Sequence, residues 1–292
     1  VDVRKPTQVQ KGRQPYFDIV RSRLHMGSHL VEMGYLDITF LGTGTSQGVP
    51  VIGCRCEVCR STHKKDRRLR SSVLLTSDKG TRICIDAGPD FRYQMLREDI
   101  DCIDAILVTH SHRDHVGGLD EVRSFNYLQQ RPMPIYANKE AAQGIKHEYS
   151  YAFEQNQYPG LPQFDLRIIT PYDTIVVNEL TIQPIEVMHY RLPTLAYRLG
   201  NFAYITDAKT ISEQEKAKLY DLDILVVNAL REEEHFSHFN LQEALQLIEQ
   251  VQPRKAYLTH ISHFMGFHDQ VNQRLPDNVQ LAFDTLQLRT EL

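Results

Sequence analysis

Short runs of aliphatic and β-branched residues recur along the chain from residue 36 onward, and Gly, Asp or Ser bounds each of them. Examples are LDITFLG, SSVLLTS, TRICIDAG and DAILVTH. This pattern is typical of β-strands. It predicts strands over residues 36–42, 71–77, 81–88, 104–110, 255–260 and 279–288.

Two longer segments combine the strand pattern with a central turn signal. Residues 174–190 (TIVVNELTIQPIEVMHY) contain Asn-Glu at residues 178–179, and residues 195–207 (LAYRLGNFAYITD) contain Gly-Asn at residues 200–201. Asn and Gly tolerate the backbone conformations that tight hairpin turns require. Each segment is therefore predicted to form a β-hairpin.

Three other segments have the composition and spacing of helices. They cover residues 118–130, 212–221 and 240–251. In the second segment, Ser212 and Glu215 have the spacing of a capping box, in which two side chains satisfy backbone N–H groups at the start of a helix.

The last of these helices is amphipathic. Asn240 precedes it and is predicted to be its N-cap. One face carries an apolar stripe, as expected for a helix that packs on a sheet. The stripe is formed by Leu241, Ala244, Leu245, Ile248 and Val251.

The order of the elements indicates one large domain. No internal repeat and no Pro/Gly-rich linker divides the sequence after residue 35, and hairpins outnumber parallel crossovers. Two mixed sheets packed face to face, with helices outside, fit this order best. We therefore predict an α+β fold over residues 35–292.

Residues 1–34 differ from the rest of the chain. They lean basic, lack clear periodicity and include HMGSHL, which resembles a cloning remnant. We expect a loosely ordered extension here. A short amphipathic helix over residues 16–24 that contacts a partner is the alternative.

The overall composition limits the partners and the compartment. The 292 residues carry a formal net charge of −4 at pH 7, whereas binding a phosphate backbone takes a surplus of Lys and Arg, so nucleic acid is not expected as a partner. No run is apolar over the length that spans a bilayer, and the N-terminal residues lack the pattern of a secretory signal. Five cysteines, three of them crowded together, make a poor disulfide framework, so we expect reduced thiols and a cytoplasmic protein.

The densest group of chemically active side chains lies in VTHSHRDHVGG. His110, His112, Asp114 and His115 directly follow an apolar strand and precede a predicted helix. Exposed loop histidines usually occur singly, whereas four potential ligands within six residues indicate a metal site. The alternation of extended backbone places the first two histidines on one side and turns the other two ligands toward a neighbouring position.

This H-x-H-x-D-H sequence, with Gly-Gly behind it, resembles the signature of the metallo-β-lactamase superfamily. The resemblance implies a four-layer αββα sandwich with two metal ions bound between the sheets. It also implies three further ligands at strand ends, and His189, Asp207 and His260 occupy such positions in the family's order. By this resemblance Asp207 bridges the two ions, of which one is held by His110, His112 and His189 and the other by Asp114, His115 and His260.

The chemistry of these ligands agrees with the resemblance. Nitrogen and oxygen donors suit Zn²⁺, Mn²⁺ or Fe²⁺, and two ions about 3.5–4 Å apart can share a hydroxide at neutral pH. We therefore expect hydrolysis, with a metal-bridging hydroxide as the nucleophile. Mn²⁺ and Zn²⁺ are both candidates for the active pair.

A second group of potential metal ligands lies in GCRCEVC. Cys54, Cys56 and Cys59 supply three thiolates, and LTHISH places His263 three residues beyond His260. Cys₃His is a common ligand set for structural Zn²⁺, so we predict one structural zinc with His263 as the fourth ligand. An iron–sulfur cluster is the rival, but the two remaining cysteines lie inside apolar strands. A disulfide within the loop is disfavoured by the expected compartment.

The cysteine loop narrows the resemblance. FLGTGTSQGVPVIGCRCEVCRS, followed by RLRSSVLL and IDAGPDFRYQ, resembles the PhnP-like branch of phosphodiesterases over most of residues 36–292. That branch opens a five-membered ribosyl 1,2-cyclic phosphate, so the resemblance implies a phosphoric diester hydrolase with a small phosphodiester substrate. The catalytic residues would be Asp114, Asp207 and His238. By the resemblance His238, which lies before a predicted helix start, contacts the phosphate or protonates the leaving oxygen; His235 is the alternative for that role.

Supporting residues can also be proposed from the sequence. Asp86, Asp90 and Asp284 are candidates to orient ligand histidines. GTGTSQG lacks the spacing and the following helix of a dinucleotide-binding loop, so we expect a turn packed near the metals.

Three other functions are kept as alternatives. A tRNA 3′-end endoribonuclease would need a basic arm, and the sequence shows no such insertion. A lactonase or thioesterase would act on esters of carboxylic acids. A non-catalytic binding protein on the same fold would lack metal ligands that are present here. The oligomeric state is left open, with a homodimer among the candidates.

Overall fold

The structure is a computed structural model, and it describes residues 34–154, 158 and 160–292. The predicted extension lies outside the described residues except for Gly34, and so does the alternative helix over residues 16–24. The described residues all belong to the compact unit Met33–Leu292.

The first sheet has seven strands in the order β14-β1-β2-β3-β4-β5-β6. Strands β14, β1, β2 and β3 pair antiparallel, whereas β3, β4, β5 and β6 pair parallel. The strands are β1 (Tyr35–Gly42), β2 (Ser72–Ser77), β3 (Arg82–Ile85), β4 (Ala105–Leu107), β5 (Met133–Ala137), β6 (Phe164–Ile168) and β14 (Gln287–Glu291).

The second sheet also has seven strands, in the order β13-β12-β11-β10-β9-β8-β7. Three consecutive hairpins make its antiparallel half, from β7 to β10, and strands β10 to β13 pair parallel. The strands are β7 (Ile175–Val177), β8 (Leu180–His189), β9 (Leu192–Leu199), β10 (Phe202–Ile205), β11 (Ile224–Asn228), β12 (Lys255–Thr259) and β13 (Val279–Leu281).

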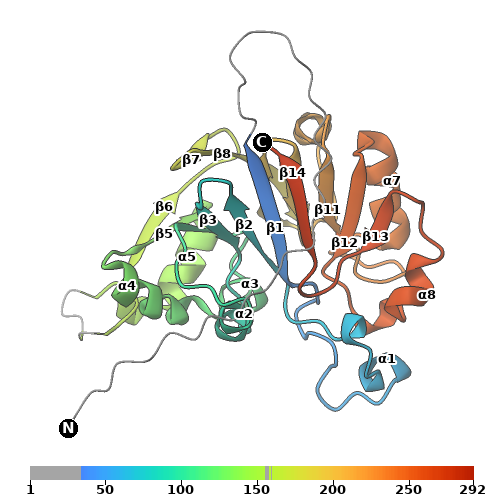
Figure 1. Cartoon of the computed structure of the whole chain (residues 1–292), viewed down its shortest axis with the longest axis horizontal. Coiled ribbons are helices and arrows are strands. Elements are labelled where there is room, and N and C mark those ends of the chain that lie inside the picture. The colour runs from blue at the N-terminus through green and yellow to red at the C-terminus, as the bar shows by residue number, and fades with distance from the viewer. Residues whose placement is uncertain (1–33, 155–157, 159) are drawn as a thin grey trace, which may run out of the picture. The chain divides into compact units, whose positions relative to one another are not determined.

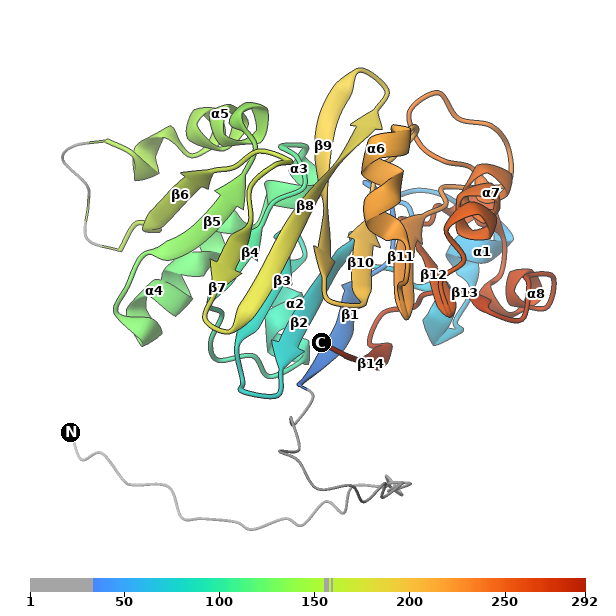
Figure 2. The same cartoon turned by 90° about the horizontal axis from the view of Figure 1, so that it is seen from above.

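Helices cover the outer face of each sheet, as Figures 1 and 2 show. The α-helices are α1 (Glu57–Arg60), α2 (Phe91–Arg97), α3 (Arg113–Val116), α4 (Arg123–Gln129), α5 (Lys139–Glu148), α6 (Glu213–Lys216), α7 (Leu241–Val251) and α8 (His268–Asn272). Short 3₁₀ turns are η1 (Lys64–Asp66), η2 (Leu119–Val122), η3 (Ser150–Ala152), η4 (Ala217–Leu219) and η5 (His263–Met265). Helices α2 to α5 pack on the first sheet, and α6 to α8 lie on the second.

Three apolar clusters follow from this layering. The central cluster joins the facing sides of the two sheets, and its largest fully buried members include Phe40, Tyr197 and Tyr204. The other two clusters lie between each sheet and its helices. Apolar surface removed from water on both faces of both sheets stabilises this arrangement. The predicted four-layer α+β sandwich is confirmed.

Two details of the predicted helices need correction. In α7, Leu247 is buried, whereas Leu241 and Leu245 are only partly buried, so the core-facing stripe is rotated from the predicted one. Before α6, Ser212 caps the Glu215 N–H as predicted, but the Glu215 carboxylate accepts from the Glu186 N–H (2.8 Å) and does not complete a capping box. The Glu215 carboxylate therefore binds the Glu186 N–H of strand β8 in place of the Ser212 N–H, which it would bind in a capping box.

None of the helices in the described part of the chain is long and apolar enough to cross a membrane. The predicted ligands all lie at or just after strand ends: after β4 in the first sheet, at the end of β8 and after β10 and β12 in the second. The fold therefore brings them to one edge of the sandwich.

Candidate metal centres

The H-x-H-x-D-H segment begins in a loop and continues into a helix. Strand β4 ends at Leu107, earlier than predicted, so His110 and His112 lie in the following loop and Asp114 and His115 on α3. The second sheet holds the start of this loop, because the Tyr197 hydroxyl donates to the Val108 carbonyl oxygen (2.6 Å). Hydrogen bonds between the two sheets thus fix where the first histidine emerges.

Glycines allow the segment to pack tightly. A Cβ on Gly88 would lie 2.0 Å from the Asp114 carbonyl oxygen, and one on Gly118 would lie 2.1 Å from the Gly88 carbonyl oxygen. No side chain fits at either position, so the Gly-Gly behind the histidines serves close backbone approach.

The other predicted ligands lie at strand ends. His189 is the last residue of β8, Asp207 follows β10, and His260 follows β12. Asp207 and His260 have φ values of 56° and 55°, in the left-handed region that non-glycine residues rarely adopt. Backbone strain of this kind concentrates at functional sites.

Three histidines form the first ligand group. One nitrogen of each of His110, His112 and His189 lies within 4.8 Å of the others. The His110 Nε2 and the His112 Nδ1 are 2.9 Å apart. His110 Nδ1 contacts the Thr109 hydroxyl (3.0 Å), and His189 Nδ1 donates to the Ser237 carbonyl oxygen (2.8 Å). These contacts engage the Nδ1 atoms of both histidines, so their Nε2 atoms are the ones that could bind a metal.

Two carboxylates and two histidines form the second group. Asp114, His115, Asp207 and His260 offer ligand atoms that again lie within 4.8 Å of one another. The His115 Nε2 lies 3.1 Å from an Asp114 oxygen and 3.2 Å from an Asp207 oxygen, and the His260 Nδ1 lies 3.2 Å from the same Asp207 oxygen. We call the seven residues of the two groups the His/Asp centre.

The predicted residue partition agrees with this geometry. The two groups contain the same residues as the two predicted ion sites, with Asp207 in the second group. Asp207 also forms a group within 4.8 Å with His189 and His238, so it lies between the two sets.

The electrostatics of the His/Asp centre favour cations. Burial works to lower the pKa of His115, but the carboxylates of Asp114, Asp207 and Asp86 raise it well above its ordinary value. Burial lowers the pKa of His110 well below its ordinary value and that of His260 to about 4, so these two imidazoles are neutral at pH 7, as metal ligands must be.

The donor set fits divalent metals. The His115 Nε2 is buried and faces oxygens of Asp114 and Asp207, but the geometry of neither contact is that of a hydrogen bond, so the three atoms are arranged more like ligands around a cation. Imidazole nitrogens and carboxylate oxygens suit Zn²⁺ or Mn²⁺. The residues present therefore fit a pair of divalent cations.

Supporting contacts hold several ligands from behind. Asp86, itself at φ 63°, accepts the His115 Nδ1–H (2.7 Å) together with two hydrogen bonds from Thr109. The Thr45 hydroxyl contacts the His260 Nε2 (3.1 Å), which places the GTGTSQG turn beside the centre as predicted.

Two of the three predicted supporting aspartates have other partners. Asp90 accepts from the Arg70 N–H, and Asp284 accepts from Thr43 and from the Leu69 N–H. Those carboxylates stabilise the loops around β1 and contact none of the ligand histidines among the described interactions.

His238 is the additional histidine of the centre. Its Nε2 lies 2.9 Å from the Asp207 Oδ1, whereas His235 contacts only Ser237, Phe236 and His238 in the interactions described. The helix start behind it is closed, because Asn240 and Glu243 form a full capping box at α7. His238 thus reaches the centre through Asp207 and is not part of an open helix N-terminus.

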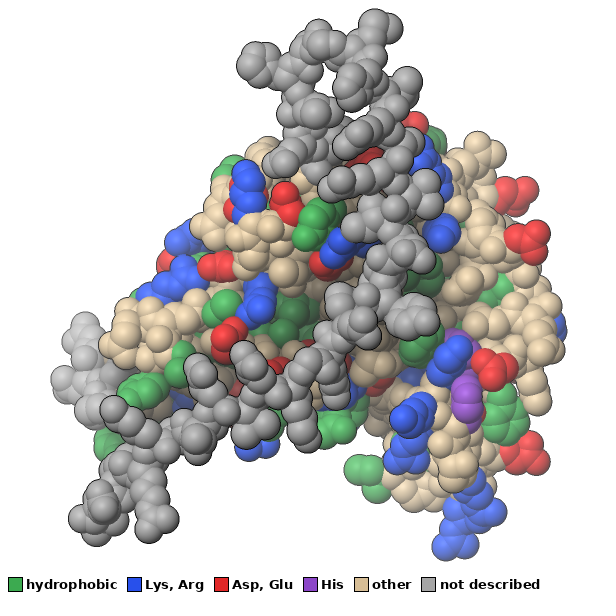
Figure 3. Space-filling model, in the orientation of Figure 1, with side chains coloured by type: hydrophobic (Ala, Val, Ile, Leu, Met, Phe, Trp, Pro, Cys, Tyr) green, Lys and Arg blue, Asp and Glu red, His purple; other side chains and the backbone are tan. Residues whose placement is uncertain are grey.

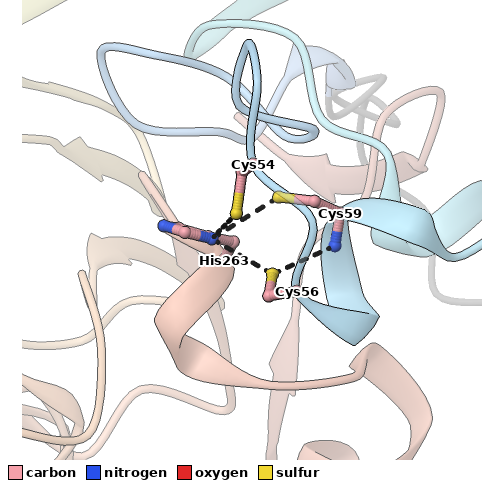
Figure 4. A group of neighbouring side chains, drawn as sticks. All are labelled: Cys54, Cys56, Cys59 and His263. Carbon is pink, nitrogen blue, oxygen red and sulfur yellow. Dashed lines mark hydrogen bonds between the residues drawn. The ribbon is translucent and has the colours of Figure 1, made fainter.

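The three cysteines and His263 form the Cys₃His site shown in Figure 4. The sulfurs of Cys54, Cys56 and Cys59 lie 3.5, 3.3 and 3.4 Å from the His263 Nδ1. A tetrahedral Zn²⁺ with ordinary Zn–S and Zn–N bonds would separate sulfur from nitrogen by about 3.5 Å. The four atoms are therefore spaced as they would be around one zinc ion.

The surroundings of the Cys₃His site are exposed and basic. Lys and Arg side chains gather over the segment of α1 in Figure 3, and Arg55, Arg60, Lys64 and Arg67 are exposed there. Burial raises the pKa of Cys59 to about 11, whereas the Cys59 N–H that donates to Cys56 lowers the pKa of the Cys56 thiol. Binding of a metal here would release protons from thiols.

Some residues around the centre were not predicted from the sequence. Thr109 orients His110 through its hydroxyl, and Ser237 orients His189 through its backbone carbonyl oxygen, a group that every residue type carries. Tyr190 and Phe236 border the centre from the β8–β9 turn and from the loop before α7. For Tyr190, its position directly after the predicted ligand His189 was the one feature of the sequence that could have indicated a place beside the centre.

The four-layer sandwich, with the His/Asp centre at one edge, is the architecture of a metal-dependent hydrolase. The beta-lactamase superfamily domain matches residues 81–261. A crystal structure described as a new diphosphatase from the PhnP family is 39% identical, with a TM-score of 0.83, and the match covers 89% of this chain and 99% of that one. The chain belongs to the metallo-β-lactamase superfamily and, within it, to the PhnP family.

Two other relatives are more distant or only partly matched. An octanoyltransferase of Porphyromonas gingivalis is 40% identical over 248 residues, which is 85% of this chain and 50% of that protein. The chain thus spans half the length of that relative. The structure of Zn²⁺-bound PqqB from Methylobacterium extorquens has a TM-score of 0.70 at 18% identity. The match covers 86% of this chain and 99% of the PqqB chain, and at this identity it supports the fold alone.

Proposed function

We propose that this protein is a dinuclear metal-dependent phosphodiesterase that opens a small cyclic phosphodiester of the ribosyl 1,2-cyclic phosphate type. One observation carries the proposal: Asp207 lies between a three-histidine group and a mixed His/Asp group, as a carboxylate that bridges two ions would. Membership of the PhnP family supports the choice of a phosphorus ester as substrate. In this proposal Cys54, Cys56, Cys59 and His263 hold a separate structural zinc.

The ligand residues determine where the reacting phosphate binds. A pair of divalent cations, Mn²⁺ or Zn²⁺, would lower the pKa of a water molecule and stabilise charge on the phosphoryl oxygens. The chain's own part is to hold both ligand groups at fixed spacing. Asp86, Thr45 and the Ser237 carbonyl oxygen do this by orienting His115, His260 and His189.

His238 is the proposed proton donor. It lies next to the centre, 2.9 Å from Asp207, and imidazole is the side-chain group best suited to proton transfer near pH 7. Water loses one proton to solvent and its oxygen forms a bond to phosphorus, while the P–O bond to the sugar oxygen breaks. That sugar oxygen takes a proton from His238, which solvent then reprotonates. The contact with Asp207 fixes the position of this imidazole beside the centre.

A diphosphate linkage is the second candidate substrate. The PhnP-family structure that is 39% identical is described as a diphosphatase, and attack on phosphorus would proceed in the same way with a phosphate as the leaving group. Octanoyl transfer is not proposed, because the chain matches only half of that relative.

The test is hydrolysis of bis(p-nitrophenyl) phosphate by purified protein, with Mn²⁺ and with a chelator. We expect metal-dependent turnover that Asp207→Ala lowers more than about 100-fold, beyond the loss typical of a supporting residue. Asp277→Ala, an exposed aspartate outside the centre, is the matched control and should retain activity. His238→Ala should slow an alkyl leaving group far more than p-nitrophenolate, since only the former needs a proton.

Three outcomes separate the candidates. Absence of turnover with both cations bound would contradict a phosphodiesterase and favour the ester hydrolases or a binding protein. Hydrolysis of ADP without turnover of the diester would favour the diphosphate candidate. Equal losses of both leaving groups in His238→Ala would remove the proton-donor role.

A further inference from the structure

An aromatic pocket of about 480 Å³ opens directly at the His/Asp centre. Its lining includes the ligands His112 and His189, and next to them Tyr190, Arg191 and Phe236. Pockets of this size hold drug-sized ligands, and the few polar groups in them fix the orientation of the ligand. The group that lies beside the reacting phosphate would therefore meet aromatic rings.

The two rings are exposed and held at a right angle. Tyr190 and Phe236 have ring centroids 5.7 Å apart and an interplanar angle of 87°. Their exposed fractions are 54% and 70%. Single exposed aromatic residues are ordinary on a protein surface, but two that lie in contact beside a metal centre form an apolar patch, and such patches mark binding sites.

The backbone at Tyr190 indicates that its side chain has a specific role. Strands β8 and β9 are joined by the two-residue turn Tyr190–Arg191, and Tyr190 has a φ of 55°. Asn and Gly are the residues that two-residue hairpin turns favour at left-handed positions, and bulky residues there are outliers. Tyr190 is thus strained where Asn or Gly would fit better.

The other two hairpins of this sheet provide an internal comparison. Their turns place Asn178 (φ 52°) and Gly200 (φ 53°) at the left-handed position, in line with the expected preference. They lie at the opposite end of the antiparallel strands from the β8–β9 turn (Figure 2). Only the hairpin turn that borders the centre departs from that preference among the three, and strained residues cluster at binding sites.

Arg191 adds a positive charge to the pocket. Its guanidinium lies 5.1 Å from the centre of the Tyr190 ring, in cation–π distance. The His235 ring packs against the Phe236 ring, with centroids 4.6 Å apart and an interplanar angle of 31°. The pocket therefore combines two supported rings with a cation, a combination that suits a planar group attached to a phosphate.

We propose that Tyr190, Phe236 and Arg191 form a subsite for a planar aromatic group of the substrate, such as a nucleobase, next to the scissile phosphate. The position of the reacting phosphate in this inference rests on the proposed function. The subsite makes a nucleoside-type phosphoester a better substrate than a sugar phosphate that lacks a base. Because a ribosyl 1,2-cyclic phosphate carries its phosphate at C1 and has no base there, the subsite favours instead, within the class of small phosphodiesters, those of a nucleoside.

The test compares two ligands that differ only in the base. Binding of thymidine 5′-monophosphate and of 2-deoxyribose 5-phosphate to the Mn²⁺-loaded protein is measured by calorimetry. We expect the nucleotide to bind about 10-fold more tightly, the scale of one base stacked on an aromatic ring. Phe236→Ala and Tyr190→Asn should reduce that ratio to about 1–3, with the affinity for 2-deoxyribose 5-phosphate unchanged.

Two controls separate binding from folding. Tyr190→Asn should keep or raise the melting temperature, because Asn relieves the left-handed strain. Tyr127→Ala removes an aromatic residue on α4 that is 78% exposed, and it should preserve the affinity ratio. Phe236→Trp should preserve the ratio, whereas Phe236→Leu should lose it, if stacking and not simple apolar contact is responsible.

Equal binding of both ligands by the wild-type protein would overturn the inference, and so would a ratio that neither variant changes. Calorimetry needs no turnover. A base-dependent affinity without hydrolysis of bis(p-nitrophenyl) phosphate would therefore contradict the proposed function and leave the subsite standing.

Discussion

The His/Asp centre and the Cys₃His site recruit their ligands in different ways. The former draws on four segments between residues 110 and 260, and most of its side chains are buried. The latter takes three of its four ligands from residues 54–59, in a loop where Cys56 and its neighbours are exposed. The His/Asp centre therefore depends on the tertiary packing of distant segments, whereas the Cys₃His site depends mainly on the local course of one loop.

The contacts behind the ligands show what that difference means. Asp86 and the Ser237 carbonyl oxygen hold ligand histidines of the centre without help from a metal, and Tyr197 holds the loop before them. At the cysteine loop, the Val51 N–H donates to the Cys59 sulfur and the Cys59 N–H to the Cys56 sulfur, and all three sulfurs contact His263. No side chain outside the ligand set contacts these sulfurs among the described hydrogen bonds. The centre is organised by the fold, whereas the cysteine loop would be organised by its zinc.

The largest effect that sharpens this comparison is expected at Asp86. Asp86→Asn weakens the buried hydrogen bond that orients His115, so turnover of bis(p-nitrophenyl) phosphate should fall about 10–100-fold. Metal analysis should show weaker binding at the His/Asp centre and unchanged zinc at the Cys₃His site. A loss of zinc from the cysteines in this variant would contradict the separation of the two sites.

Removing one thiolate tests the other side of the comparison. Cys59→Ser should release one zinc per chain and lower the melting temperature by about 5–10 °C, as a loss of about 2–3 kcal/mol would do in a domain of this size. Turnover should fall less than about 10-fold, because no cysteine lies in the His/Asp centre. Zinc content and thermal unfolding measure these effects.

The matched control is Cys102→Ser, since Cys102 is a partly buried thiol outside both sites. It should keep the zinc content and the melting temperature. If Cys59→Ser abolished turnover completely while the fold survived, the cysteine loop would have a direct part in the reaction.

Much of this arrangement could be predicted from the sequence, because its signals are local. Strand patterns and turn residues placed the hairpins, and the spacing of His110 to His115 was enough by itself to indicate a metal group. The resemblance then added His189, Asp207 and His260, whose ligand roles remain predictions that the geometry supports.

The remainder depended on contacts between distant segments. Asp86, Asp90 and Asp284 look alike in the sequence, but only Asp86 meets a ligand histidine, because β3 lies beside β4 in the sheet. The helix start after His238 resembled an anion site, yet the Asn240–Glu243 capping box closes it. Which neighbour satisfies a polar group is decided by tertiary packing, and sequence spacing does not report it.

The smallest expected effect concerns the link between the two sites. Residues 43–45 lead from β1 toward the cysteine loop, and the Thr45 N–H donates to the Ile261 carbonyl oxygen (3.1 Å), between the ligands His260 and His263. Thr45→Val removes the hydroxyl that contacts His260, so turnover should fall about 2–10-fold, the cost of one hydrogen bond. Thr45→Ser should restore it. The turnover of the Thr45→Val, Cys59→Ser double variant then shows whether the two sites are linked. Losses of turnover that add, on a free-energy scale, mean that the sites are independent. A double variant no slower than Cys59→Ser alone means that the cysteine loop acts through Thr45.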